Sequence, residues 1–319
     1  MPSNRPFHFV FISIILIFIC SNSLFGGLYH RPPFKYRYYG KDEKLIDKLD
    51  RELRIKLKHI EGCLQIDTRS HAGVWEREEL NDSELIGSVN IYLTLTADDF
   101  KRMTKGRVPK WAGGVAYPRR NSIVVKTPLY FGQGVPLEVL TAHELTHILV
   151  HRIVGDNYLP RWLDEGLAQV LSGESRHGSL ARLGRAAISD RLMGLPRVDD
   201  VLNFSYPDAD LAYAEARSAT AWLVAQYGWD AVVKLLNEMG KGTDIEDAFP
   251  RVFDVGYEYW QVEWIEYAKK KYSVAVLLDI DSLIWVFILG LGAVAVVAVF
   301  IRRRIQFKRW REEEEEEML

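Results

Sequence analysis

Cysteine is scarce in this chain, which has only Cys20 and Cys63 among its 319 residues. Small secreted domains that depend on disulfides carry several cysteine pairs, so the sequence implies no disulfide framework. Cys20 lies in the first apolar run of the chain. We interpret Cys63 as a small core residue rather than a metal ligand.

An excess of charge of either sign is also lacking. The chain has 41 basic and 43 acidic residues, and its formal net charge is −2. Domains that bind nucleic acids usually concentrate positive charge, so we expect no nucleic-acid partner. Hydrophobic residues make up 48% of the chain and charged residues 26%, which is typical of a packed protein with one large domain or two closely joined lobes.

The two ends of the chain predict a secreted and membrane-anchored protein. Residues 1–23 resemble a signal peptide: Arg5 precedes an apolar run, and Ser21 and Ser23 form a small-x-small cleavage pattern. An uncleaved signal anchor is the alternative. Residues 283–301 carry no charge and are long enough to cross a bilayer as a helix.

Charges around residues 283–301 predict the orientation. Asp279 and Asp281 precede this run, and six basic residues follow it, beginning at Arg302. Because positive charge favours the cytoplasmic side, we expect a protein of the cell membrane with a cytoplasmic C-terminus, and with the residues before the span outside the cytoplasm. A cleaved signal peptide requires the same topology. Residues 302–319 form a cytoplasmic charged tail ending in a run of glutamates at 312–317, which we expect to be disordered.

The most informative motif is H-E-L-T-H at residues 143–147. The surrounding segment reads as a helix that starts at Pro136 and stops at Gly155. His143 and His147 are four residues apart, so both imidazoles project from one face of that helix. This geometry gives a zinc ion two ligands, and Glu144 stands beside them as a candidate general base.

A second motif, W-L-D-E-G-L-A-Q at residues 162–169, supports the first. Glu165 lies near the start of a second helical run, after the breaker Pro160. A carboxylate on a neighbouring helix completes three protein ligands and leaves the fourth zinc position open for water, as a catalytic site requires.

These two motifs resemble those of the gluzincin metallopeptidases, the superfamily of thermolysin and the zinc aminopeptidases, and within it the peptidase MA-like family. The metzincin pattern fails, because Val150 and Ile153 stand where its glycine and third histidine belong. The resemblance covers about residues 89–272. It implies an α+β, thermolysin-like catalytic domain with an N-terminal mixed sheet, a zinc helix and a helical C-terminal lobe.

The rest of the chain is consistent with this fold. Residues 24–88 form an N-terminal region of helix and loop, with an amphipathic helix at 41–60 and a charged loop at 68–81. Strands are expected at 89–95, 111–117 and 121–126. Further helices are expected at 98–103, 180–193, 211–227, 229–239 and 257–272. By the resemblance, residues 113–116 are the edge strand that holds the substrate backbone; a glycine-softened turn is the alternative.

The resemblance also implies roles for individual residues. His143, His147 and Glu165 would hold Zn²⁺, and Glu144 would take the proton of the attacking water. Tyr213 or Tyr206 would donate a hydrogen bond to the oxyanion. Gln169 and Asp164 are both candidate partners of a zinc-bound imidazole. The alternative role of Asp164 is that of a negative charge in the first turn of its helix. His151 is one turn too far for the same ion, so we interpret it as structural or surface.

The sequence therefore predicts a membrane-anchored, extracytoplasmic zinc metallopeptidase that acts on peptides or proteins. The alternative is a non-catalytic membrane protein that keeps the peptidase fold as a peptide-binding groove or scaffold. Retention of Glu144 beside three intact ligands favours the enzyme, because binding alone does not need a general base.

Overall fold

The computed structural model describes residues 27–38, 40, 42–66, 88–109, 111–127, 134–175, 179–273 and 280–317. The chain divides into two compact units, one made of Met1–Ser179 with Leu192–Ile265 and the other of Leu180–Arg191 with Glu266–Leu319. The first unit holds the sheet and both motifs of the predicted zinc site. The predicted signal peptide and the predicted loop at 68–81 lie outside the described residues.

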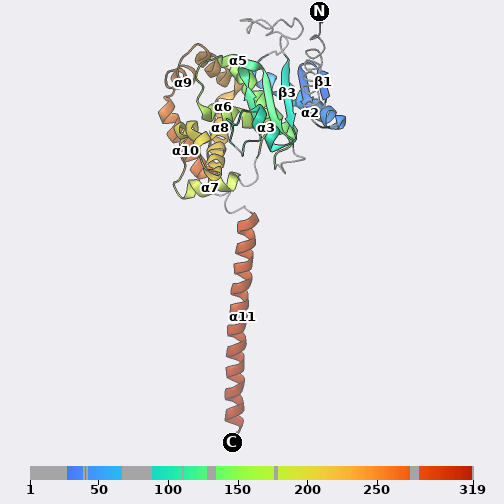
Figure 1. Ribbon diagram of the computed structural model, residues 1–319. Helices are drawn as coiled ribbons and strands as arrows, with labels where there is room; N and C mark the ends of the chain where they lie inside the picture. The colour runs from blue at the N-terminus through green and yellow to red at the C-terminus, as the bar shows by residue number, and fades with distance from the viewer. Residues whose placement is uncertain are drawn as a thin grey trace, which may run out of the picture. The chain divides into compact units, whose positions relative to one another are not determined.

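A five-stranded mixed sheet forms the N-terminal part of the first unit (Figure 1). Its order is β1-β2-β3-β5-β4, with parallel pairs β2/β3 and β3/β5 and antiparallel pairs β1/β2 and β4/β5. The strands are β1 (Gly27–Arg31), β2 (Phe34–Tyr38), β3 (Val89–Thr94), β4 (Gly114–Tyr117) and β5 (Ser122–Lys126). The last three are the predicted strands, and β4 is an edge of the sheet, as expected for the segment at 113–116.

Strands β1 and β2 were not predicted, because their segment is rich in Pro, Tyr and basic residues. In β2 the side chains alternate: Phe34, Tyr36 and Tyr38 are buried, and the residues between them are partly exposed. The hydroxyl of Tyr36 donates to Asp50 on α2 (Glu43–Leu64) over 3.0 Å. The aromatic positions are therefore core positions, and their polar ends have partners within the fold.

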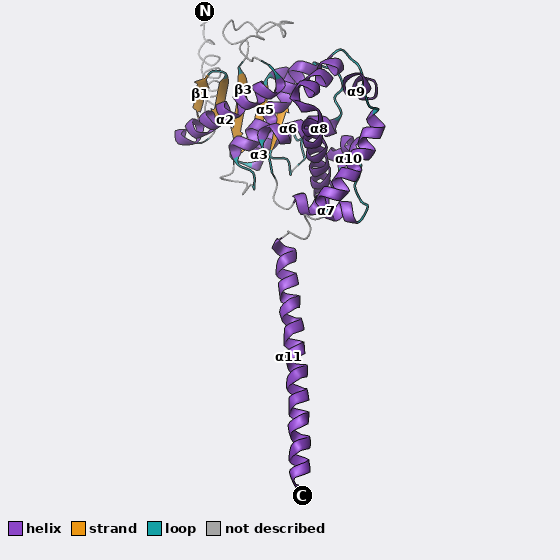
Figure 2. Cartoon of the chain, turned by 180° about the vertical axis from the view of Figure 1, so that it is seen from behind, coloured by secondary structure: helices purple, strands orange, loops and turns teal. Residues whose placement is uncertain are grey.

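After β5 the described chain is helical, and Figure 2 shows α5 and α6 beside the strands. α5 (Leu137–Val154) begins after Pro136 and ends at Gly155, which has a φ of 69°, so the helix predicted around H-E-L-T-H is confirmed with its two ends. α5 packs against β4 and β5 on one side and against α6 (Arg161–Ser172) on another, and α6 packs on α8 (Tyr206–Gly240). The predicted α+β class, with an N-terminal mixed sheet and a helical second half, is confirmed.

Several element boundaries differ from expectation. α8 contains the two helices predicted at 211–227 and 229–239, and the predicted break at Gly228 is confirmed, because its φ of 76° is not helical. Its start at Tyr206 lies earlier in the chain than expected. α9 (Ile245–Phe253) was missed; Asp244 caps its first turn by accepting from the backbone N–H of Asp247. The remaining helices are α3 (Ala97–Met103), α7 (Ser179–Ile188), α10 (Tyr257–Tyr272) and the short η1 (Pro118–Arg120) and η2 (Leu195–Asn203).

The last helix, α11 (Ile280–Glu317), belongs to the second unit and contains most of the predicted tail. The expectation of a disordered tail is therefore wrong for residues 302–317. Arg and Glu are good helix formers and can pair one turn apart, which lets the helix of the apolar run continue. A search confined to the described residues finds no helix long and apolar enough to cross a membrane, so the span predicted at 283–301 has no support from it.

Gly166 allows α6 and α8 to approach closely. A Cβ at this position would lie 2.0 Å from Oγ1 of Thr220 and 2.5 Å from the backbone oxygen of Ala216, both on α8. Contacts this short require a shift of one helix, because the backbone of α8 cannot rotate away as a side chain does.

We expect Gly166→Ala to lower the free energy of unfolding by about 1–3 kcal/mol, the usual cost of overpacking a core. Gly62→Ala on α2 is the matched control, because a Cβ there meets nothing within 4 Å. The control should be neutral or stabilise by up to about 1 kcal/mol through helix propensity. Urea unfolding of both variants measures this, and equal stabilities would contradict the close packing.

Candidate metal centre

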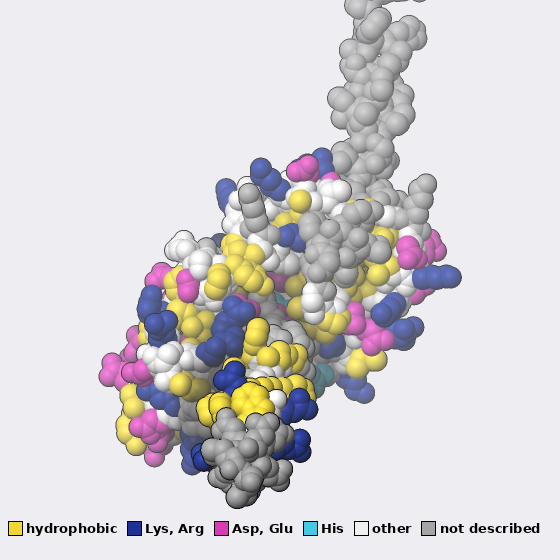
Figure 3. Space-filling view, turned by 90° about the horizontal axis from the view of Figure 1, so that it is seen from below, with side chains coloured by type: hydrophobic (Ala, Val, Ile, Leu, Met, Phe, Trp, Pro, Cys, Tyr) yellow, Lys and Arg dark blue, Asp and Glu magenta, His cyan; other side chains and the backbone are white. Residues whose placement is uncertain are grey.

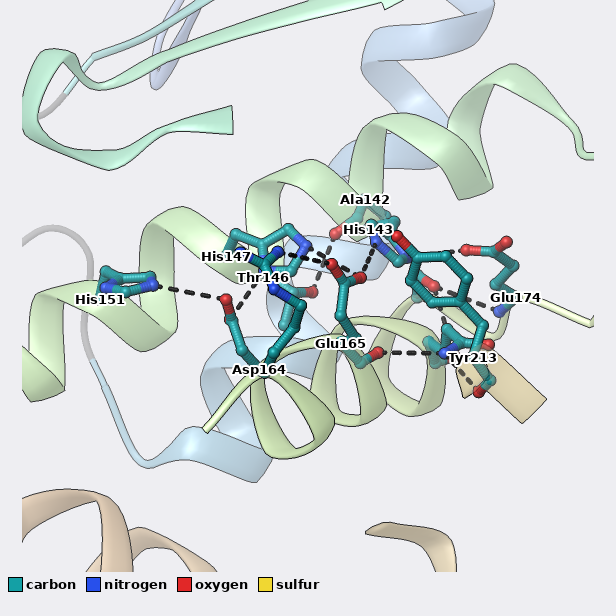
Figure 4. A network of polar contacts seen from close by, with 12 residues as sticks. Ala142, His143, Thr146, His147, His151, Asp164, Glu165, Glu174 and Tyr213 are labelled. Atoms are coloured by element: carbon teal, nitrogen blue, oxygen red, sulfur yellow. Dashed lines mark hydrogen bonds and ion pairs between the residues drawn. The ribbon is translucent and has the colours of Figure 1, made fainter. Parts of the chain in front are cut away.

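Helices α5 and α6 bring the three predicted metal ligands together (Figure 4). His143 and His147 lie one turn apart on α5, and the centres of their rings are 4.9 Å apart. Glu165 comes from the first half of α6. One ligand atom from each of these three buried residues lies within 4.8 Å of the others.

The spacing of these atoms fits one tetrahedral zinc ion. Zinc binds imidazole nitrogen and carboxylate oxygen at about 2.1 Å, so two ligand atoms at the tetrahedral angle lie about 3.4 Å apart. Nε2 of His143 is 3.4 Å and Nε2 of His147 is 3.7 Å from Oε2 of Glu165. Three donors at these distances leave a fourth position for another ligand.

The second nitrogen of each imidazole faces a carboxylate. Nδ1 of His147 lies 2.7 Å from Oδ1 of Asp164, at hydrogen-bond geometry. Nδ1 of His143 lies 2.7 Å from Oε2 of Glu174, an ion-pair distance without the alignment of a hydrogen bond. A carboxylate on Nδ1 holds the ring in place and leaves Nε2 for a metal, as is usual for zinc-bound histidines.

The charges of the site favour a cation at its centre. Burial alone lowers the pKa of His147, but Asp164 and Glu165 reverse this and raise it to about 9. His143 behaves in the same way: Glu174 and Glu165 outweigh its burial and raise its pKa well above the ordinary value. Four carboxylates, Glu144, Asp164, Glu165 and Glu174, thus lie around the two imidazoles, and the donor set fits a divalent metal, whose binding would displace these protons.

Glu144 lies against the edge strand β4 rather than among the ligands. A Cβ at Gly114 would lie only 2.7 Å from Oε1 of Glu144, so the absence of a side chain at Gly114 makes room for this carboxylate. Burial raises the pKa of Glu144, while His143 and His147 oppose the rise. A carboxylate with a raised pKa is a stronger proton acceptor, which suits a general base.

A cavity of about 370 Å³ opens onto the site. Its walls include the three ligands, Glu144 and residues 113–117 along β4. Tyr213 also lines the cavity and packs edge-to-face on Trp111, with ring centres 6.0 Å apart. Tyr206, the other predicted oxyanion donor, is 55% exposed and does not line this cavity. Of the two tyrosines, Tyr213 is therefore the one near the ligands.

The expected role of Gln169 is wrong. Its side-chain nitrogen donates to the backbone oxygens of Glu165 and Tyr213, over 3.3 and 2.9 Å, and the Nδ1 atoms of the two imidazoles face Asp164 and Glu174 rather than its side-chain oxygen. Asp164 takes that place instead, and its other oxygen lies 3.5 Å from Nε2 of His151. The sequence offered both candidates but could not show which side of α6 faces α5.

Glu174 was not predicted. It follows the end of α6, where Gly173 has a φ of 73° and the backbone N–H of Glu174 donates to the oxygen of Gln169. This type of helix end turns the chain back along the helix, and so brings Glu174 to His143. The only signal in the sequence was a glycine at a helix end followed by an acidic residue.

We expect Asp164→Asn and Glu174→Gln each to weaken zinc binding about 10–100-fold, because each removes the carboxylate that orients a ligating imidazole. Competition with a chelator of known affinity measures this on the purified protein. Glu138→Gln is the matched control: it removes a carboxylate from the first turn of α5, away from the ligands. Unchanged zinc affinity in both site variants would exclude this role.

Comparison with known proteins agrees with this geometry. A search of curated proteins finds no match to the chain. A family model described as the peptidase MA superfamily matches residues 72–270, which is more than half of the chain and includes every residue of the site. The predicted resemblance is thereby confirmed, and the chain belongs to the peptidase MA superfamily.

Proposed function

We propose that the protein is a zinc-dependent peptidase anchored in a membrane, with its catalytic domain outside the cytoplasm. The observation that carries the catalytic part is the convergence of His143, His147 and Glu165 beside Glu144, in a cavity bounded by the free edge of a sheet. The substrate class is peptides or proteins, as membership of a peptidase superfamily indicates.

Each residue of the site has a separate role in peptide hydrolysis. His143, His147 and Glu165 hold the metal, and Asp164 and Glu174 fix the two imidazoles. When bound, Zn²⁺ acidifies water and polarises the scissile carbonyl group. Glu144 takes the proton from the attacking water and passes it to the leaving amine.

Two further parts of the site position the substrate. Among the residues that the structure describes, β4 pairs with β5 alone, so its other edge has backbone groups that an extended peptide can bind as an added strand. Tyr213 lines the same cavity, and its hydroxyl group would donate a hydrogen bond to the oxyanion.

Glu144→Gln tests the proposal, because it keeps size and much of the hydrogen bonding but removes the proton acceptor. Turnover of a quenched peptide library should fall about 10²–10⁴-fold, while zinc content and peptide affinity stay near those of the wild type. All three are measured on the full-length protein. Equal turnover with full zinc would remove Glu144 from the mechanism. A wild type that binds zinc and peptide without hydrolysis would favour the scaffold alternative.

Membrane anchoring rests on the sequence and on the surface of α11. No charged residue occurs at 283–301, and basic residues follow. Within this run α11 exposes large apolar side chains, among them Phe287, Leu289 and Phe300, each at least 67% exposed. A continuous apolar surface of this kind needs a cover, and lipid would supply it.

The predicted topology has a direct test. Protease added to intact cells should digest the region before residue 279 and spare a tag placed after Leu319, because the basic residues after the span favour the cytoplasm. Digestion of the tag in intact cells would reverse the orientation. Release of the intact protein by salt without detergent would exclude the span itself.

A further inference from the structure

A second cavity adjoins the one at the metal centre. It has a volume of about 500 Å³, in the usual range of ligand sites. The two cavities share part of their walls, namely Arg107, Ala116, Tyr117, Pro118 and His151. A substrate peptide in an extended conformation that passes the metal ligands and continues beyond Tyr117 therefore enters this second cavity.

Basic side chains dominate the second cavity. Its lining includes four Lys or Arg residues but a single carboxylate, Asp156. Asp156 is paired with Arg119, whose Nε lies 2.8 Å from its Oδ1. The other three, Lys105, Arg107 and Arg120, are exposed, and no carboxylate among the described residues forms an ion pair with them. We call these three the basic wall.

The basic wall is a local feature, since the chain as a whole has a formal net charge of −2. The face drawn in Figure 3 likewise shows Lys and Arg side chains interspersed with acidic ones. A cleft that concentrates one sign of charge raises the local concentration of ligands of the opposite sign. We therefore expect ligands that carry carboxylates to bind at the basic wall rather than elsewhere on the surface.

Tyr117 connects the basic wall to the catalytic carboxylate. Burial raises the pKa of Tyr117, Arg120 and Arg107 act to lower it, and Glu144 acts to raise it. Two members of the wall and Glu144 thus all act on the same phenol group. Arg107 also lines the cavity at the metal centre together with Glu144, so a single short peptide can reach both the wall and the catalytic centre.

The length of β4 determines the distance between the basic wall and the catalytic centre. Gly114, at one end of β4, contacts Glu144, and Ala116 to Pro118 line both cavities. A strand rises about 3.3 Å per residue, so this shared wall lies about 7–13 Å from the catalytic carboxylate. A peptide added to the edge of β4 has the same rise, and side chains two to four residues from the scissile bond would reach the second cavity.

We propose that the protein prefers peptides that carry acidic side chains two to four residues from the scissile bond, on one side of that bond only, and that Lys105, Arg107 and Arg120 bind them. This inference rests on the proposed peptidase function. A carboxylate could also come from the free C-terminus of a substrate. Three cations are distributed along the cavity, so they can pair with several side-chain carboxylates at once, whereas a substrate has a single C-terminal carboxylate.

The test compares matched quenched peptides on the zinc-loaded, full-length protein. In one set Asp and Glu are replaced by Asn and Gln at each position on either side of the scissile bond, and in another the C-terminus is free or amidated. We expect kcat/KM to be about tenfold higher for the acidic peptides at low salt, and this ratio to shrink as salt screens the exposed charges. The effect should occur on one side of the bond and survive amidation.

Substitutions in the basic wall test whether it causes the preference for acidic peptides. Lys105→Gln combined with Arg120→Gln leaves only Arg107 of the wall, so it should remove most of the acidic preference while leaving cleavage of the neutral peptides intact. Lys101→Gln combined with Arg102→Gln is the matched control: it removes the same charge from α3, whose residues 101 and 102 do not line either cavity. The control should keep the full preference.

The outcomes separate this inference from the proposed function. Equal cleavage of acidic and neutral peptides would overturn the acidic preference and leave the peptidase intact. A preference that vanishes on amidation would assign the wall to a terminal carboxylate instead and overturn the side-chain proposal. If no peptide is cleaved, the proposed function fails, and binding of the fluorescent acidic and neutral peptides still decides whether the wall selects carboxylates.

Discussion

Burial of several carboxylates around two imidazoles is the constraint on which the rest of this structure depends. Glu144, Glu165 and Glu174 are each at most 7% exposed, and Asp164 lies beside them. Buried charges of one sign repel each other strongly unless cations neutralise them. The imidazoles and Arg161 neutralise part of this charge, and a metal ion held between α5 and α6 would neutralise more of it.

The fold supports this cluster through close packing on both sides. Gly114 lets the sheet edge come up to Glu144, and Gly166 lets α8 come up to α6 behind Glu165. α6 is also fixed at its start, because the backbone N–H of Arg161 donates to Asp199 of η2 over 2.7 Å. A catalytic geometry needs such support, since ligands held loosely lose the alignment on which rate depends.

Local sequence patterns predicted the elements that local forces decide. The spacing of His143 and His147 follows from the helical period alone, and Pro136 and Gly155 marked both ends of α5. The pairing of β2 with β3 could not be predicted, since it joins segments on either side of α2. Glu174 was missed for a related reason: its contact with His143 depends on a turn at Gly173 and on packing between helices. The choice of Asp164 over Gln169 depends on how α6 is rotated about its axis, which spacing within one helix does not determine.

Asp164 and Glu165 are neighbours in the chain, yet one holds His147 and the other faces both imidazoles. Any movement of α6 therefore shifts the metal ligand Glu165 and, at the same time, the hydrogen bond to Asp164 that holds the second ligand, His147. A bound ion would act as a cross-link between α5 and α6, and the free energy of metal binding would be shared with the folding of this pair of helices. The same residues that make the site would then make the stability of the domain depend on the supply of metal.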